Sequence, residues 1–519
     1  MTMAWLFGAG QAYDAFLLGF RIPNLTRDLF AEGALSSAFV PVFTEYLEQR
    51  GKREAARLAA TVGTALVIVV GLLCLLGIVF SPQLVALFAP GFARVPGKFE
   101  LAVTLTRVMF PFLLLVVLAA QAMGVLNACG RFGVPALAST WFNIGSVAAG
   151  LALVYTAART FSLDPIVAMA IGVVAGGFLQ LAWQWPSLVR AGFTQRPRLE
   201  WSHPGLRRIA RLTAPAIIGG AAVQINVMVN TNFASTIADA AGHVIDGPVS
   251  WLGYAFRFMQ LPLGLFGVAI GTATLPAISR SAALGRMEEF RATLARSLGM
   301  VLLLTIPSSV GLAVLGESMI GAVYQSGRFQ AADTHQTAVA LGGYAAGLAG
   351  YAAIKVLAPA FYALNDARTP MLVSLLSVAV NYAGSSMLVG RFGHAGLALS
   401  TSLVALAGAA ALFLAMRAKC GAVGGRPLVR SVVKIAAAAA VMGLACSASS
   451  RAVHAWLGAS RTAHLADAAL SIPLGLAVFG VLAHLLRVPE LDAARSAACY
   501  TFLSNASRPE AGGPVTGSR

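Results

Sequence analysis

The sequence has 519 residues, of which 58% are hydrophobic and 11% charged, and its mean hydropathy is +0.77. A soluble protein of this length needs more polar surface to cover its core, so the composition excludes the soluble class. Inside a membrane, backbone hydrogen bonding requires helices or a closed barrel. The apolar runs at 64–80 and 301–315 are unbroken, whereas barrel strands alternate every second residue. We therefore expect an all-α polytopic membrane protein.

The net charge of +17, from 37 basic and 20 acidic residues, has a simpler explanation than binding to nucleic acid. One set of alternate loops contains 23 basic residues and the opposite set contains 7. Basic residues gather in cytoplasmic loops of membrane proteins. The bias predicts that the first set and the C-terminus are cytoplasmic, and it requires no nucleic acid partner.

In chain order, the sequence predicts thirteen spans if the first segment crosses once. That first segment, from about Ala4 to Leu47, is broken, and the tail 504–519 is polar and expected to be a disordered cytoplasmic segment. Thirteen spans with a cytoplasmic C-terminus put the N-terminus outside, which is unusual without a signal sequence. We expect either two short spans in the first segment or a missing upstream helix. The other spans are predicted near 58–89, 101–126, 134–158, 164–188, 208–236, 249–277, 296–324, 335–363, 369–390, 394–417, 429–449 and 464–487.

Two halves of the chain carry the same landmarks in the same order. Pro23, Gly91, Asn127 and Pro135 are matched by Pro262, Gly327, Asn365 and Pro370, at offsets of 239, 236, 238 and 235 residues. A near-constant offset indicates duplication into two parallel lobes around a central site. We expect an N-lobe at 1–190, truncated at its start, a C-lobe at 200–417, and two additional helices at 428–488.

Ionisable residues inside a membrane are costly and are functional candidates by default. Five basic against three acidic groups leave about two uncompensated positive charges, for which a diphosphate is the natural counter-ion. Arg27 and Arg257 are the strongest candidates, each on a segment with a helix-breaking proline. Snorkelling or local pairing is an equally good explanation for Arg21 and Arg107, and Lys355 could instead hold a helix break. The predicted substrate-binding residues are Arg27, Arg257, Arg21, Lys355 and Arg107, and the acidic cavity or gating residues are Asp14, Asp28 and Glu32.

Other chemistry has no sequence support. The five cysteines show no paired spacing, the seven histidines show no metal-ligand spacing, and no phosphate-binding Walker loop occurs. We expect no enzyme activity, no catalytic residues, no metal and no bound cofactor.

The run "FGAGQAYDAFLLGFRIPNLTRDLFAEGALSSAFVPVFTEYL" resembles the opening signature of the MurJ (MviN) lipid II flippases. The resemblance continues through "LNACGRFGVPA", "FGVAIGTATLPAIS" and "KVLAPAFYALNDARTP". It implies two six-helix lobes around a cationic cavity, with two extra C-terminal helices holding part of a groove for a polyprenyl tail. Arg27 and Arg257 match the family's cavity arginines, and Asp14 and Glu32 match its acidic positions. This sequence departs from the family pattern in two places. The family's first helix is missing, and Phe256 stands where the family often has an acidic residue.

The resemblance implies a flippase that moves lipid II, a polyprenyl diphosphate carrying the peptidoglycan disaccharide-pentapeptide, from the inner to the outer leaflet of the bacterial cytoplasmic membrane by alternating access. Expected partners are lipid II, membrane lipids and cell-wall synthesis machinery, and the expected drive is a coupling ion or the membrane potential. The alternatives are an O-antigen-type polysaccharide-lipid exporter or multidrug exporter of the same superfamily, or a non-transporting scaffold. The cationic balance argues against a multidrug exporter, whose cavities favour acidic residues.

Overall fold

The computed structural model describes residues 1–27, 35–156, 163–193 and 197–492. Within these ranges the regular structure is helical, apart from one antiparallel bridge between Ala238 and Val244. Nine of the described helices are long and apolar enough to cross a membrane, or ten if the bent pair α14–α15 is one span. The prediction of an all-α polytopic membrane protein is therefore confirmed.

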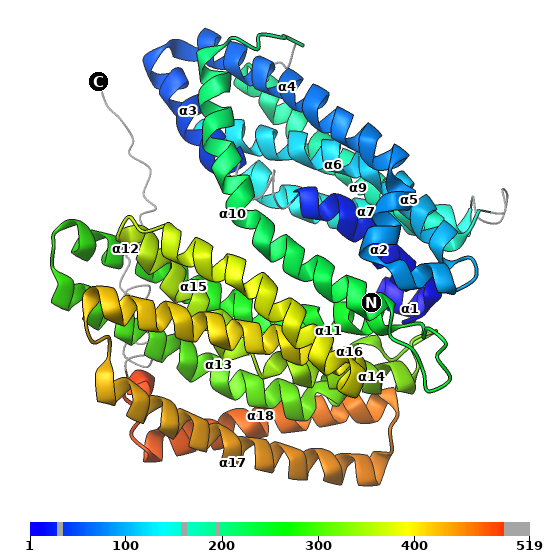
Figure 1. The fold of residues 1–519 in the computed structure, drawn as a ribbon, viewed down its shortest axis with the longest axis vertical. Helices are drawn as coiled ribbons and strands as arrows, with labels where there is room; N and C mark the ends of the chain where they lie inside the picture. Colours follow the sequence, from blue (N-terminus) through cyan, green and yellow to red (C-terminus); the bar gives the residue numbers. More distant parts are fainter. Residues whose placement is uncertain (28–34, 157–162, 194–196, 493–519) are drawn as a thin grey trace, which may run out of the picture. The chain divides into compact units, whose positions relative to one another are not determined.

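The chain divides into two compact units, and the first comprises 1–256, 323–340 and 374–401 (Figure 1). Its main packing joins α7 to α9, α6 to α9 and α2 to α6. Its helices are α1 (Thr2–Phe7), α2 (Gln11–Arg27), α3 (Leu35–Gln49), α4 (Gly51–Val79), α5 (Ser81–Phe88), the 3₁₀ turn η2 (Pro90–Arg94), α6 (Lys98–Ala128), α7 (Gly133–Tyr155), α9 (Pro165–Ala191) and α10 (Pro204–Ser235).

The second unit comprises 257–322, 341–373 and the chain from 402 onward. Its core is apolar and centres on Phe290, Val301, Val356 and Phe361. Three helices have residues in both units: α11 (Pro248–Pro262), α14 (Ala331–Ala345) and α16 (Arg368–Cys420). The remaining helices are the π-helix η3 (Leu263–Val268), α12 (Ala269–Ala283), α13 (Met287–Tyr324), α15 (Leu348–Ala363), α17 (Gly425–Leu457) and α18 (Arg461–Leu485).

The predicted spans and the observed helices differ in places. The spans predicted at 369–390 and 394–417 form one helix, α16, with a break at Gly393, where φ is 55° and ψ is −135°. The span predicted at 335–363 is the pair α14 and α15, bent by 44°. The span predicted at 208–236 lies within α10, a helix of 32 residues from Pro204 to Ser235. The predicted tail at 504–519 lies outside the described residues.

The helix breaks expected at two prolines are not breaks in the structure. Pro23 lies inside α2, which continues to Arg27, and Pro262 is the last residue of α11 before the π-helix. A proline removes one backbone donor, which α2 tolerates at Pro23, whereas at Pro262 the chain changes to a π-helix and then continues as α12. The prediction of a Pro-broken helix beside each arginine is therefore wrong.

Small residues allow α7 and α9 to pack backbone against backbone. A Cβ on Gly172 would lie 2.6 Å from the Ser146 carbonyl oxygen and 2.7 Å from the Gly150 Cα. A Cβ on Gly176 would lie 2.6 Å from the Phe142 carbonyl oxygen. Gly172 and Gly176 form a GxxxG pair, the spacing that lets membrane helices approach closely.

We expect Gly172→Ala to destabilise the protein, because the added methyl group meets backbone atoms that cannot move aside. Overpacking of this kind costs about 1–3 kcal/mol. Thermal unfolding in detergent measures it. Gly71→Ala on α4 is the matched control, since a Cβ there meets nothing within 4 Å and alanine is the better helix former. An equal or higher unfolding temperature for Gly172→Ala than for Gly71→Ala would contradict the close packing.

Candidate functional site

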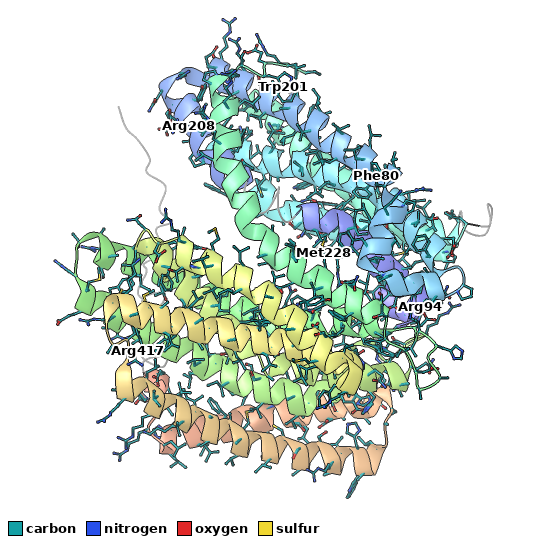
Figure 2. The ribbon with its side chains drawn as sticks, in the orientation of Figure 1. Phe80, Arg94, Trp201, Arg208, Met228 and Arg417 are labelled. Atoms are coloured by element: carbon teal, nitrogen blue, oxygen red, sulfur yellow. The ribbon has the colours of Figure 1, made fainter. Side chains whose placement is uncertain are left out.

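Basic residues from opposite predicted sides of the membrane lie at opposite ends of the first unit. Figure 2 shows Arg208, with Trp201, at one end and Arg94 at the other. Arg208 belongs to the set of loops with 23 basic residues and Arg94 to the set with 7. Members of the two sets therefore lie at opposite ends of this unit, and which end is cytoplasmic stays a prediction.

The end that contains Arg94 also contains a buried ion cluster. The Lys98 side chain is only 1% exposed, and its Nζ lies 2.8 Å from Asp14 Oδ2 and 2.6 Å from Asp246 Oδ1. Lys98 Nζ also lies 4.4 Å from the centre of the Phe92 ring. The Asp14 side chain is 1% exposed, while Asp246 is partly exposed. Removing one partner of a buried ion pair leaves an uncompensated charge. Each of the three groups is therefore stable in this position only while the others are present.

Asp14 also caps a helix to which it does not belong. Its Oδ2 accepts a hydrogen bond from the Gly247 backbone N–H at 2.8 Å. Its Oδ1 accepts from the Ser250 N–H at 2.8 Å and the Ser250 hydroxyl at 2.5 Å. These donors lie at the N-terminus of α11, where free N–H groups and the helix dipole favour a carboxylate. One side chain of α2 thus completes the first turn of α11.

The same end of the unit is reinforced by contacts to the segment 323–340. The Trp251 indole N–H donates to Asp333 Oδ1 at 3.1 Å. The Tyr254 ring packs on Tyr13 at 4.8 Å and on Tyr324 at 4.7 Å, measured between ring centres. Asp14 and Tyr13 of α2 therefore hold α11 in place at the predicted outer end of this unit.

Sequence reasoning missed Lys98, which is one of the seven basic residues in the second set of loops. The available signal was its position directly before a long apolar run, on the side that carries few basic residues. Asp246, directly before the Gly-Pro that opens α11, was also not considered. Acidic partners on distant segments identify such a lysine only once the fold brings them together.

Arg27 lines a cavity inside the first unit. The cavity has a volume of about 330 Å³, and Arg27, at the end of α2, is half-buried. Its polar lining comes from α7 and α9, as Ser139, Asn143, Gln180 and Gln184. A guanidinium opposite amide and hydroxyl groups can bind a ligand that combines an anion with neutral polar groups.

Two other predicted cationic residues of this unit make local contacts. Arg21 Nη1 donates to the Thr231 hydroxyl of α10 at 2.5 Å. Arg107 is exposed, and its Nε donates to the Ile78 carbonyl oxygen near the end of α4 at 3.3 Å. Both contacts resemble the local pairing that sequence analysis kept open for these residues. Asp28 and Glu32 lie outside the described residues.

Arg257 and Lys355 belong to the second unit. Both are exposed, Arg257 on α11 and Lys355 on α15. A Cβ on Gly271 of α12 would lie 2.5 Å from the Lys355 carbonyl oxygen, so α12 and α15 are in close contact at this level. The structure thus places Arg27, Arg21 and Asp14 in one unit and Arg257 and Lys355 in the other.

A neutral polar cluster between α10 and α16 also escaped sequence analysis. The Asn381 side-chain amide donates to Asn230 Oδ1 at 3.1 Å, and Asn230 donates to the Thr401 hydroxyl at 2.8 Å. Ser400 donates to Asn381 Oδ1 at 3.2 Å. Individual asparagine, serine and threonine residues give no periodic pattern, and for this reason the cluster has no visible sequence signal.

At the opposite end of the unit, ion pairs join the loop before α10 to α4, and α10 itself to α3. Arg57 Nη2 lies 2.9 Å from Glu200 Oε2, and Arg208 Nη1 lies 2.7 Å from Glu45 Oε2. Hydrogen bonds from Arg57 and Arg198 hold the pKa of the Glu200 carboxyl below its usual range. Among the described residues, no three histidine, cysteine, aspartate or glutamate side chains are placed to hold a metal ion.

Comparisons with known proteins agree with this architecture. The family model "Lipid II flippase MurJ" matches residues 3–465. The "Lipid II flippase MurJ" of Burkholderia cenocepacia is 35% identical over 419 residues, covering 80% of this chain and 79% of that protein. The "Probable lipid II flippase MurJ" of Rhizobium meliloti is 36% identical over 454 residues, covering 85% and 81%.

Solved structures share the fold. A lipid II flippase MurJ in an inward closed conformation aligns with a TM-score of 0.75 and 24% identity, over 93% of this chain and 95% of that one. An inward-facing multidrug transporter of the MATE family aligns with a TM-score of 0.68 and 15% identity, over 82% and 94%. The match to the family model and the extent of the sequence identity show that the chain belongs to the lipid II flippase MurJ family.

Proposed function

We propose that this protein translocates lipid II from the inner to the outer leaflet of the bacterial cytoplasmic membrane. The observation that carries the proposal is the position of Arg27, in a cavity with amide and hydroxyl side chains, in a chain of the MurJ family. Its guanidinium suits a diphosphate and the amides suit a sugar-peptide headgroup. Arg257 is the second proposed phosphate contact, and the C-terminus is proposed to be cytoplasmic.

The cluster of Asp14, Lys98 and Asp246 is proposed to be the outer gate. A substrate released outside must pass between helices that this cluster joins, so the contacts between α2, α6 and α11 have to separate during the cycle. The buried ammonium favours the closed arrangement because it loses both carboxylates on opening. Alternating access then consists of breaking this cluster while the inner end closes.

The drive is proposed to be an ion gradient or the membrane potential. Moving one elementary charge across the whole membrane potential is worth about 2.3 kcal/mol per 100 mV, and a charged group that moves through part of the field contributes the corresponding fraction. The protein is proposed to act without a bound cofactor and without catalytic chemistry, and membrane lipids and the cell-wall synthesis machinery are its proposed partners.

Arg27→Ala is expected to abolish rescue of cells depleted of their own flippase, because a charge-assisted hydrogen bond worth about 1.5–3 kcal/mol is lost. Arg27→Lys is expected to retain partial function, since it keeps the charge but not the bidentate geometry. Growth and the exposure of lipid II outside the cell are measured at matched protein levels.

Arg94→Ala is the control for Arg27, because Arg94 is an exposed loop residue at the outer end. Full rescue by Arg27→Ala would contradict the role of Arg27. Failure of the unmodified chain at normal expression, with lipid II retained inside, would instead contradict the substrate and favour the O-antigen-type exporter.

Lys98→Met is expected to open the outer end, because Asp14 and Asp246 are then left with no cation between them. Loss of one partner from a buried pair costs about 3–5 kcal/mol. A membrane-impermeant maleimide reports the opening at a cysteine introduced for Ala9, which is 7% exposed in the closed arrangement.

The matched control is Lys419→Met, which removes a lysine from its pair with Asp366 at 2.8 Å, in which the two side chains are 43% and 16% exposed. Lys419 reaches water and is not part of the cluster, so labelling at position 9 is expected to stay at the original level. Equal labelling in Lys98→Met and Lys419→Met would show that the cluster is not a gate.

A further inference from the structure

The second unit contains a buried carboxylate on α18 that the proposed function does not use. Asp467 is 0% exposed. Its Oδ2 accepts hydrogen bonds from the Ser318 hydroxyl of α13 and from the Ser450 hydroxyl of α17, the latter at 2.6 Å. Its Oδ1 accepts from the Ser471 hydroxyl at 2.5 Å. Figure 1 shows α17 and α18 as antiparallel neighbours, and Asp467 connects both helices to α13.

A histidine of α17 faces this carboxylate. His454 Nε2 lies 3.1 Å from the Ser318 hydroxyl oxygen and 3.5 Å from Asp467 Oδ2. Its other ring nitrogen, Nδ1, lies 2.8 Å from the Gly458 carbonyl oxygen. A carbonyl oxygen can only accept, so Nδ1 must carry a hydrogen. In a neutral imidazole, Nε2 is then an acceptor.

With His454 neutral and Asp467 ionised, the three side chains have one hydrogen fewer than their contacts with one another require. Ser318 has a single hydroxyl hydrogen, which it donates to Asp467. The lone pair of His454 Nε2 then faces an oxygen with no hydrogen to offer and, beyond it, a negative charge. One added proton removes this conflict. It can reside on Nε2, giving an imidazolium beside a carboxylate, or on Asp467, with Ser318 turned to donate to Nε2.

We propose that His454, Ser318 and Asp467 form a site for one exchangeable proton, and that this proton holds the α17–α18 pair against the end of α13. The ligand is a proton from the outer aqueous phase. His454 is 26% exposed at its side chain, which provides access. The site lies next to the segment between Arg451 and Arg461, which loop charges assign to the outer side.

The ionisable groups near His454 are consistent with a proton on His454 or Asp467. His464 of α18 packs edge-to-face on His454, with ring centres 4.9 Å apart, and its Nδ1 is buried without a hydrogen-bond partner. A charge on that ring would be poorly solvated, so His464 is not the proton's position. A Cβ on Gly321 of α13 would lie 2.4 Å from this ring, which fixes its place. Three further charged groups lie on the same helices: Glu317 of α13 acts on His464, Arg461 of α18 donates to the Ala322 carbonyl oxygen at 3.3 Å, and Arg451 of α17 contacts the Ser447 hydroxyl at 3.4 Å.

The site is separate from the residues proposed to bind lipid II, so it can be tested without translocation. The full-length protein in lipid nanodiscs is examined by hydrogen–deuterium exchange between pH 5.5 and pH 8.5, with correction for the intrinsic rate. The peptides of interest span 446–470. We expect their exchange to rise as the pH increases and the shared proton leaves, by about tenfold for each pH unit over which one linked proton is lost.

His454→Gln is the decisive variant, because its amide N–H can donate to Ser318 or Asp467 at every pH. Its exchange over 446–470 is expected to be slow and independent of pH. Asp467→Asn removes the carboxylate, and its exchange is likewise expected to lose its pH dependence, whatever its absolute rate. One variant changes the histidine and the other changes the carboxylate. If one of them does not fold, the other still tests the proposal.

The matched control is His243→Gln, which removes the exposed histidine 3.8 Å from Asp239, with side chains 83% and 46% exposed. It is expected to keep the original pH profile over 446–470. A pH-independent profile in the unmodified protein would overturn the proposal. So would a His454→Gln profile with the same rise as the unmodified protein.

Discussion

A lysine ammonium taken out of water must be matched locally, and the first unit of this protein is organised around one. Lys98 is 1% exposed and has two carboxylates within 2.8 Å. The effective cost of burying such an ion is several kcal/mol, which only close and well-oriented partners offset. Those partners come from α2 and from the turn before α11. Segments about 150 residues apart in the chain are therefore held at one point.

Two other buried polar clusters in the described part of the chain use different chemical groups. Asp467 is surrounded by serine hydroxyls, which solvate a carboxylate without adding charge. The contact between α10 and α16 uses neutral side chains only, with Asn381 accepting and donating at its centre. The three arrangements differ in their physical effect, because an ion cluster resists separation, hydroxyls tolerate a change of protonation, and amides fix the register of two helices.

Much of the fold could be predicted from sequence, because membrane spans depend on local composition. The runs at 101–126 and 164–188 became α6 and α9 with small changes in their ends. The helix breaks at Pro23 and Pro262 were predicted wrongly, because a proline only removes one donor and its neighbours decide whether the helix continues. The duplication into two lobes stays a prediction.

The candidate site was predictable only in part. Arg27 and Asp14 stood out because charge is rare in apolar segments, but their partners did not. Lys98 looked like a loop residue until α2 and α11 enclosed it. Gln180 and Asn143 are uncharged and follow no special spacing in the sequence, and the packing of α7 on α9 brings them to one cavity. That packing has a further consequence. Because glycines bring the two backbones into contact, we expect the amide-bearing wall of the cavity to keep its spacing, so that any change in the width of the cavity requires movement of α2, which carries Arg27.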